Sequence, residues 1–203
     1  MVALSDRVKE LIDRKEKVCI ELGCGGNKKD ASTIGIDVLD GEGVDLVGDA
    51  FDVLDAFPDN SIDCVYAYHF IEHVPDVAKL LSVLVRVMRV DGILEFVAPH
   101  FSNPYFYSDP THKSTFGLYT FAYLSDSSIF SRQVPSYVRD MRFQLKNTDL
   151  VFKSSRPFYI RYLIKSLWGK IFNSCAFMRE LYEENFCYLI PCYEVKYVLV
   201  FKG

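Results

Sequence analysis

The sequence predicts an α/β fold in which helices cover a mostly parallel β-sheet. Between residues 17 and 99, short runs of β-branched and apolar residues alternate with an amphipathic helical segment. Glycine or aspartate follows several of these runs, as is common at the carboxyl ends of parallel strands. The 203 residues, half of them hydrophobic, suffice for one domain with a sizeable core.

The elements of the first half follow in a regular order. A helix is expected near residues 4–12, where the apolar residues share one face and Ser5 can cap the amino end. Strands are expected at 17–22, 32–38, 44–50, 61–69 and 93–99, with a helix at 74–89. This alternation is typical of a parallel sheet. The glycine turn at 23–26 lies so close to the second strand that we expect a short or missing helix between them.

The alternation ends after residue 100. Segment 100–126 mixes aromatic residues with Pro, Asp and Thr without a clean period, and 134–141 suits a short helix. Strands are expected at 143–155 and 193–203, and residues 156–186 are expected to be helical. We therefore predict a single domain over 1–203, with insertions near 101–142 and 154–190.

Composition narrows the classes of partner. The net charge of −4 gives no reason to expect nucleic acid, whose binding domains are usually basic. The charged amino terminus lacks an apolar signal segment and no run of 18 apolar residues occurs, so we expect a cytoplasmic protein. Six irregularly spaced cysteines without a CxxC pair indicate reduced thiols and no structural zinc.

The first motif with chemical content is ELGCGGNK at residues 21–28. Gly23 and Gly25 let the backbone approach a ligand closely, although an ordinary strand-ending turn uses the same residues. Neither GxGxxG nor GxxxxGK[ST] is satisfied. A pyrophosphate favours a helix amino end facing it, and this turn leaves little room for such a helix. It also predicts that residues 27–31 are exposed.

Carboxylates end the next two expected strands. Asp37 can accept hydrogen bonds from a ribose diol, and Asp49 can accept one from an adenine amino group. Either residue alone is equally suited to capping a helix or closing a turn. Their position at the same sheet edge as Gly23 and Gly25 favours a nucleoside site. We therefore expect Asp37→Ala to weaken cofactor binding far more than Lys28→Ala.

Several short patterns occur in a fixed order between residues 16 and 98. They are ELGCG at 21–25, an acid at 37, GDA at 48–50, Asp63 followed by EH-x-x-D at 72–76, and LLSVLVRVMRVDG at 80–92. In this order they resemble class I S-adenosylmethionine-dependent methyltransferases. The resemblance implies a Rossmann-like sheet, mostly parallel with an antiparallel C-terminal strand, and aromatic lid insertions. It looks most like an LGCG-type subgroup associated with polysaccharide or secondary-metabolite biosynthesis.

The resemblance implies an enzyme with S-adenosyl-L-methionine as its cofactor. Asp37 would bind the ribose, Asp49 the adenine, and Tyr68 and His69 would lie near the sulfonium methyl group. The implied cofactor-binding residues are Glu21, Gly23, Cys24, Gly25, Asp37, Val38, Asp49, Ala50, Tyr68 and His69. The acceptor is expected to be a small molecule, first of all a hydroxyl of a sugar or of a polysaccharide or lipid-linked precursor. The alternative is a non-catalytic cofactor-binding regulatory or partner subunit.

All four histidines lie between residues 69 and 112. A hydroxyl acceptor benefits from a base near neutral pH, and histidine suits that role. The predicted catalytic residues are His112 as the base, His69, Asp109 and His100. The predicted acceptor-binding residues are His73, Tyr105, Tyr107 and His112. Asp109 could also bind a divalent metal with His69 or His100, but the pattern is not diagnostic and we assign no metal.

The segment RPFYIRYLIKSLWGKIFN at 156–173 combines basic and aromatic residues at helical spacing. Such a helix can lie on a membrane surface or pack on the domain as a lid. We favour the lid. A nucleic-acid methyltransferase is disfavoured by the acidic charge and by YAYH at 66–69, where an NPPY-like sequence would stand.

Overall fold

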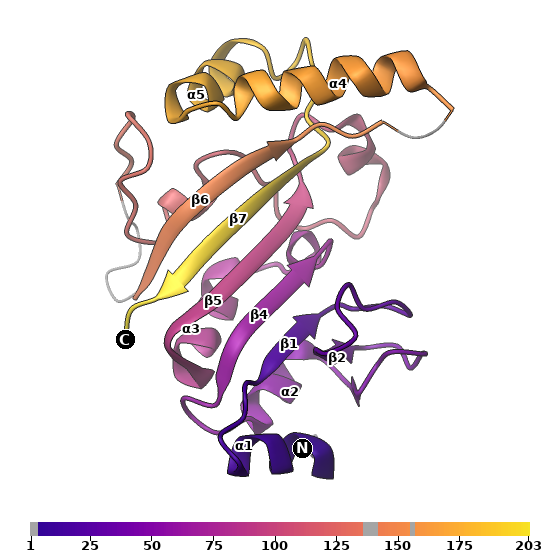
Figure 1. The fold of residues 1–203 in the computed structure, drawn as a ribbon, viewed down its shortest axis with the longest axis vertical. Coiled ribbons are helices and arrows are strands. Elements are labelled where there is room, and N and C mark those ends of the chain that lie inside the picture. The colour runs from indigo at the N-terminus through magenta and orange to yellow at the C-terminus, as the bar shows by residue number, and fades with distance from the viewer. Residues whose placement is uncertain (1–3, 136–141, 155–156) are drawn as a thin grey trace.

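The computed structural model describes residues 4–135, 142–154 and 157–203. Most of the short helix expected at 134–141 lies outside these residues. A seven-stranded sheet in the order β3-β2-β1-β4-β5-β7-β6 organises the fold (Figure 1). The strands are β1 (Cys19–Leu22), β2 (Ile34–Asp37), β3 (Leu46–Val47), β4 (Ile62–Tyr68), β5 (Met88–Pro99), β6 (Phe143–Val151) and β7 (Glu194–Phe201).

The first five strands pair in parallel, and β7 inserts between β5 and β6 with antiparallel pairing to both. This topology confirms the predicted α/β class, the mostly parallel sheet and the antiparallel C-terminal strand. The inserted strand has a consequence for function. It brings Glu194 opposite Pro99, at the carboxyl end of β5, although the two residues lie far apart in the sequence.

The α-helices are α1 (Asp6–Asp13), α2 (Ala50–Ala56), α3 (Val77–Val87), α4 (Tyr159–Phe172) and α5 (Ala176–Asn185). Three short 3-10 helices complete the pattern: η1 (Ile71–His73), η2 (Pro104–Ser108) and η3 (Thr120–Ala122). Figure 1 shows α2 and α3 behind the sheet and α4 with α5 across one end of it. No helix among residues 4–135, 142–154 and 157–203 is long and apolar enough to cross a bilayer.

Two apolar clusters hold these elements together. The larger one joins strands of the sheet to α1, α2 and α3, and it includes fully buried Ile20, Leu54 and Leu84. The smaller one lies under α4 and α5 and centres on Phe172 and Tyr182. Burial of large apolar side chains supplies most of the favourable free energy of folding. Helices α4 and α5 are therefore anchored by their own cluster at the end of the sheet, whereas β6 and β7 also pack into the larger cluster.

The segment between β1 and β2 contains no helix, as expected, and polar contacts hold it in place. The buried carboxylate of Glu21 accepts a hydrogen bond from the backbone of Lys29 at 3.0 Å. The Lys28 ammonium donates to Asp45 at 2.7 Å and to the Thr33 carbonyl at 2.8 Å. The prediction that residues 27–31 are exposed was therefore wrong for Lys28, whose side chain is 11% exposed. The other four residues are exposed.

Three boundaries differ from the expected ones. Asp49 does not end a strand: its side chain accepts from the Phe51 backbone N–H and caps α2, a helix that the sequence pattern did not reveal. The helix expected at 156–186 is broken near Asn173, whose side chain makes two hydrogen bonds to the backbone of Leu150 in β6. These two hydrogen bonds tie the chain to β6 at the point where α4 ends. Likewise β5 begins at Met88, because residues 88–92 already pair or turn beside β4.

Candidate active site

A cavity of about 440 Å³ opens at the carboxyl ends of β1, β2, β3 and β4. Ligand pockets in proteins commonly span 300–1,000 Å³. Six of the predicted cofactor-binding residues line it: Gly23, Asp37, Val38, Asp49, Ala50 and His69. The structure thus brings the strand-end residues of four neighbouring strands to one cavity, as parallel pairing requires.

Gly23 occupies a position that only glycine fits. Its φ angle is +64°, in the left-handed region. A Cβ atom there would lie 2.6 Å from the ring of Phe70, which also lines the cavity. The glycine therefore lets the first turn and the segment after β4 approach each other closely at the cavity wall.

The carboxylate of Asp37 connects two backbone segments at the cavity. One oxygen accepts from the Gly25 N–H at 2.8 Å and the other from the Leu39 N–H at 3.0 Å. Each carboxylate oxygen has two lone-pair sites, so both retain capacity for a ligand hydroxyl. In Asp49, one oxygen caps α2, which again leaves acceptor capacity at the cavity edge. Asp37 and Asp49 can therefore each accept from the backbone and from a ligand at the same time.

Four predicted cofactor-binding residues lie outside this cavity lining: Glu21, Cys24, Gly25 and Tyr68. Glu21 is 2% exposed and braces the loop after β1. Cys24 is also buried, and burial raises the pKa of its thiol to about 11. Tyr68 donates to Glu95 at 3.0 Å. Glu21 and Gly25 instead make hydrogen bonds that hold the loop bordering the cavity.

A second cavity of about 240 Å³ adjoins the first, because His69 and His73 line both. Predicted residues His112, Asp109 and Tyr105 line it too, together with Glu72, Pro99, Asn103, Phe106 and Tyr193. Segments that are distant in the sequence therefore meet at one place, next to the predicted cofactor cavity. This arrangement suits a site for an acceptor.

His69 bridges two carboxylates where the cavities meet. Its Nε2 lies 2.8 Å from Glu194 and its Nδ1 lies 3.4 Å from Glu72. The hydrogen bonds to Glu194 and then to Glu72 raise the pKa of His69 to about 9, because both carboxylates stabilise the imidazolium. A ring that is protonated at neutral pH cannot accept a proton. The structure therefore does not support a base role for His69 and favours a positioning role.

His112 has a free ring nitrogen at the second cavity. Its Nδ1 lies 2.8 Å from the carbonyl oxygen of Phe106, which can only accept, so Nδ1 carries the proton. In the neutral ring Nε2 then keeps its lone pair, and it lies 3.7 Å from Asp109. The Asp109 carboxylate also accepts from Thr111, which lowers its pKa. His112 thus has the tautomer that a base or a metal ligand needs.

Two predicted residues lie away from the second cavity. His100 is fully buried, with hydrogen bonds from its ring to Ser102 and Glu183. Tyr107 is exposed and donates to the Phe101 carbonyl. Although His100 follows β5, its side chain is buried like the last four residues of that strand. The structure does not support a catalytic role for His100 or an acceptor contact for Tyr107.

Sequence reasoning missed two residues in this region. Glu194 has no motif around it and reaches His69 only because β7 inserts next to β5. Glu72 was not among the predicted site residues, and it lies in the 3-10 turn η1 with its carboxylate 1% exposed. The pair EH at 72–73 was a usable signal, since both side chains line the second cavity.

Comparisons with known proteins agree with this architecture. Residues 27–96, about a third of the chain, match the family model described as a methyltransferase domain. No curated protein matches the sequence. An S-adenosylmethionine-dependent methyltransferase from Archaeoglobus fulgidus has a similar structure, with a TM-score of 0.59 at 17% identity. The match covers 96% of this chain and 91% of that one.

Two further solved structures are similar. One is phosphoethanolamine N-methyltransferase 2 of Haemonchus contortus in complex with S-adenosyl-L-methionine, with TM-score 0.52 and 13% identity over 98% of this chain and 52% of that one. The other is a complex of the Haloferax volcanii Trm112 methyltransferase activator with a candidate methyltransferase, with TM-score 0.55 and 15% identity over 97% and 94%. At such identities the similarity establishes the fold alone. Together with the domain match, it confirms the methyltransferase class that the sequence predicts.

Proposed function

We propose that this chain transfers a methyl group from S-adenosyl-L-methionine to a hydroxyl of a small molecule, with sugars and lipid-linked sugar precursors as the first acceptor class. The observation that carries the proposal is the junction of the two cavities at His69 and His73. A cofactor in the first cavity would present its methyl group toward an acceptor in the second.

The residues of the first cavity fit this cofactor. Asp37 and Asp49 retain carboxylate lone pairs for ribose and adenine, and Gly23 lets Phe70 pack closely at the cavity wall. The absence of a helix between β1 and β2 costs nothing here, because S-adenosylmethionine carries no phosphate that needs a helix amino end. When bound, the cofactor supplies a methyl group on a sulfonium, whose sulfur takes the electron pair of the broken C–S bond.

The residues of the second cavity would orient the acceptor and manage its proton. In the simplest scheme the acceptor oxygen forms the new O–C bond while its hydroxyl proton passes to Nε2 of His112. The His112 ring, only 10% exposed, is held by the Phe106 carbonyl, so the lone pair is already oriented. The protein's contribution is then mostly alignment, which can supply a large share of the rate enhancement of a displacement reaction.

Aromatic residues support a sugar as the first acceptor class. Tyr105 is 68% exposed and its ring lies 6.5 Å from that of Tyr193, and both residues line the second cavity. Rings at a cavity mouth can stack on the apolar face of a sugar. The resemblance to LGCG-type methyltransferases of polysaccharide biosynthesis points the same way.

The experiment is a transfer assay with methyl-labelled S-adenosylmethionine against nucleotide sugars, free sugars and sugar lipids. We expect label in at least one sugar class and formation of an equal amount of S-adenosylhomocysteine. Tight cofactor binding with no transfer to any class would favour the alternative, a non-catalytic binding subunit. Transfer to amines only would retain the enzyme class and contradict the hydroxyl acceptor.

A further inference from the structure

We infer that Glu72, His73 and His112 form a binding site for a divalent transition-metal ion. One ligand atom from each of these side chains lies within 4.8 Å of the other two. Two imidazoles with one carboxylate are a donor set that suits zinc, iron, cobalt or nickel better than magnesium or calcium. The set comes from two chain segments that converge at the floor of the second cavity.

The carboxylate of Glu72 is the strongest indication. The residue is 1% exposed, and its Oε2 has no hydrogen-bond partner. Leaving a buried carboxylate oxygen unsatisfied is costly, so such atoms are usually paired or bound to metal. Its other oxygen lies 3.4 Å from His69, which fixes the direction of the carboxylate. A cation beside Oε2 would satisfy the unpaired atom.

Both histidines are oriented as metal ligands usually are. The Nδ1 of His112 donates to the Phe106 carbonyl, and this leaves Nε2 unprotonated. The Thr111 hydroxyl donates its proton to Asp109 at 2.6 Å. The oxygen of the same hydroxyl therefore accepts a hydrogen bond from Nδ1 of His73 at 3.0 Å. Metal-binding histidines generally donate their second ring N–H to such an oxygen. Nε2 is therefore the free nitrogen of both rings.

The required movement is small. Zinc holds its ligands at about 2.0–2.2 Å, which places tetrahedral ligand atoms roughly 3.3 Å apart. The three side chains would close by roughly 1–1.5 Å around the ion, within the reach of side-chain rotation. Three protein ligands leave at least one coordination position open, and all three of these residues line the second cavity. Asp109, whose carboxylate lies 3.7 Å from Nε2 of His112, stands beside that position.

This inference deepens the proposed function and rests on it for its chemical meaning. An acceptor hydroxyl in the open position would lose its proton more easily, because a divalent ion stabilises the alkoxide. The proton would then leave to water in the cavity, and His112 would act as a ligand instead of the base. The O–C bond would form and the C–S bond would break as before.

Metal binding is tested without cofactor or acceptor. The full chain, with Cys175→Ser to remove an exposed thiol ligand, is stripped with EDTA and titrated with Zn²⁺ by calorimetry and with Co²⁺ by visible absorption. We expect one equivalent to bind, at least tenfold weaker binding in Glu72→Gln and His112→Asn, and no change in Glu184→Gln. Circular dichroism confirms folding. Equal binding by all four proteins, or no binding by the parent, would overturn the inference.

The activity assay separates the two proposals. If EDTA abolishes transfer and Zn²⁺, Co²⁺ or Mn²⁺ restores it, both stand. If transfer survives EDTA and the calorimetry shows no site, the metal inference fails and the methyltransferase proposal stands with His112 as base. If the metal binds but no acceptor is methylated, the metal inference stands and the proposed function fails.

A second inference comes from α4, whose apolar stripe faces outward. Ile160, Leu163 and Leu167 are 77%, 65% and 56% exposed, and Ile164 and Ile171 continue the same spacing. Surface helices normally turn such a stripe toward the core. Phe158, Tyr159, Tyr162, Phe177, Tyr188 and Leu189 add exposed apolar side chains on or near α4 and α5. A patch of this size marks an interaction surface.

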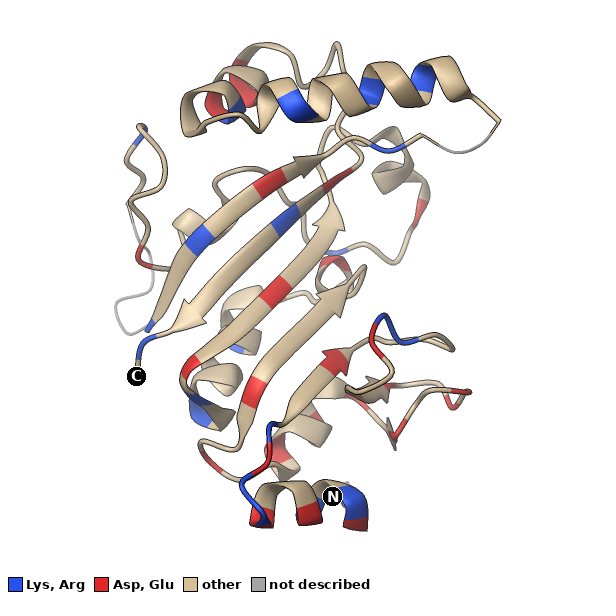
Figure 2. Cartoon of the chain, in the orientation of Figure 1, with Lys and Arg blue, Asp and Glu red and all other residues tan. Residues whose placement is uncertain are grey.

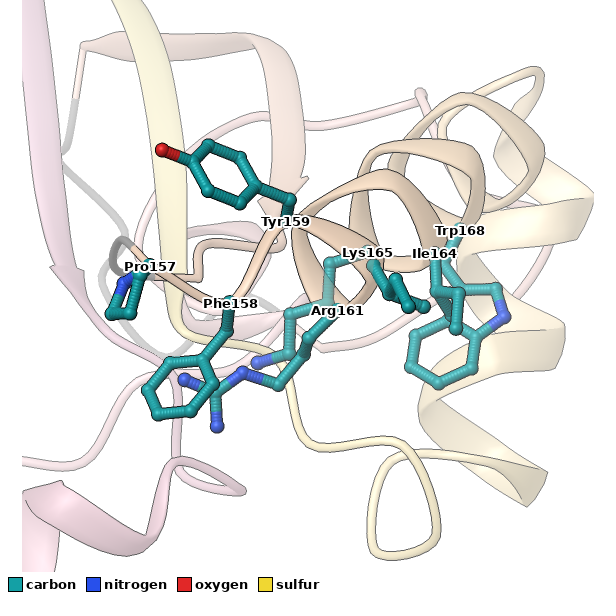
Figure 3. A pocket seen from close by; sticks show the side chains of 8 residues that line it. Pro157, Phe158, Tyr159, Arg161, Ile164, Lys165 and Trp168 are labelled. Carbon is teal, nitrogen blue, oxygen red and sulfur yellow. The ribbon is translucent and has the colours of Figure 1, made fainter.

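The charge of α4 indicates the kind of partner. The helix contains Arg161, Lys165 and Lys170 and no acid, although the whole chain has a net charge of −4 (Figure 2). Arg161 and Lys165 lie along a groove of about 580 Å³, together with Phe158 and Trp168 (Figure 3). Burial lowers the pKa of Lys165. Apolar residues beside cations are the features of helices that lie in anionic membrane surfaces.

We propose that α4 docks this end of the molecule onto an anionic lipid bilayer. A second copy of the chain would present the same three cations, so an anionic surface is the better electrostatic match. The exposed aliphatic stripe would enter the boundary between headgroups and acyl chains, and Arg161 and Lys165 would lie at the phosphates. No residue of α4 lines either of the two cavities, among the residues that the structure describes.

Vesicle sedimentation tests this docking. We expect binding to vesicles of phosphatidylcholine with phosphatidylglycerol, weak binding to phosphatidylcholine alone, and a decline as salt rises. The double variant Leu163→Gln/Leu167→Gln should lose at least tenfold in binding, whereas Val90→Gln, at an exposed site on β5, should not. Unchanged binding by the double variant would overturn the proposal. So would a dimer of the parent in light scattering that the double variant abolishes, since a second copy would then cover α4.

Discussion

The two cavities that meet at His69 and His73 are constructed in different ways. The cofactor cavity is formed by the ends of neighbouring parallel strands and depends on backbone hydrogen bonds and carboxylates such as Asp37. The second cavity gathers side chains from η1, η2, the loop before residue 112 and the segment entering β7. The first arrangement follows from the sheet itself, and the second from contacts between distant segments.

The difference indicates where mutations should act. A residue at a strand end acts on cofactor affinity or on the fold, because it is tied to the sheet. A side chain in the second cavity acts on the reaction, because few backbone bonds depend on it. Four substitutions test this division, from the largest expected effect to the smallest.

His112→Asn should lower kcat for methyl transfer by about 100-fold or more, because it removes the free ring nitrogen at the second cavity. The dissociation constant of S-adenosylmethionine should stay unchanged, since His112 does not line the first cavity. Steady-state kinetics and calorimetry measure the two quantities. A weaker cofactor affinity with normal kcat would contradict the division between the cavities.

Asp37→Ala should weaken cofactor binding by roughly 30-fold, equivalent to about 2 kcal/mol, through lost hydrogen bonds and a looser Gly25 turn. Calorimetric titration with S-adenosylmethionine provides the measurement. The matched control is Asp40→Ala, an exposed acid three residues further on. Affinities that agree within a factor of three for both variants would show that Asp37 does not contact the cofactor.

Gly23→Ala should lower the free energy of unfolding by about 2 kcal/mol, because alanine at a left-handed φ brings its Cβ against Phe70. Gly26→Ala is the control, since a Cβ there meets nothing closer than 4.0 Å. Urea unfolding followed by circular dichroism compares the two. Equal stability would mean that Phe70 moves freely, and the close approach would then not be a constraint.

Lys28→Ala should cost about 1 kcal/mol of stability, because the Lys28–Asp45 ion pair and the bond to Thr33 hold the loop after β1. Lys29→Ala, at an exposed neighbouring lysine, should cost nothing measurable. Thermal unfolding distinguishes the pair. Two identical melting curves would restore the original expectation that this loop is only solvent-exposed.

The sequence was sufficient for the parallel part of the sheet and for most of the residues that follow its strands. Period and turn chemistry locate β1 to β5, and parallel pairing then brings Gly23, Asp37 and Asp49 together. It did not reveal α2, because a seven-residue helix after Asp49 has too little length to show its period. The burial of His100 could not be read from its position in the sequence either, since the direction of a side chain at a strand end depends on local packing.

The second cavity could be anticipated only in part. Clustering of the histidines pointed to His73 and His112, which lie with ring centroids 5.0 Å apart. The contribution of Glu194 could not be predicted, because it depends on β7 entering the sheet between β5 and β6. The sequence also could not predict that the apolar stripe on α4 faces outward. A helix whose apolar stripe is buried has the same spacing of apolar residues.

The central claim is that the cofactor cavity supplies a methyl group to the second cavity, and one kinetic comparison tests it most directly. Labelled-methyl transfer to the best sugar acceptor is followed against cofactor concentration for the parent chain, Asp37→Ala and His112→Asn. We predict that Asp37→Ala approaches the parent rate at high cofactor, whereas His112→Asn stays slow at every concentration. A parent chain that binds S-adenosylmethionine and transfers no label to any acceptor would contradict the claim.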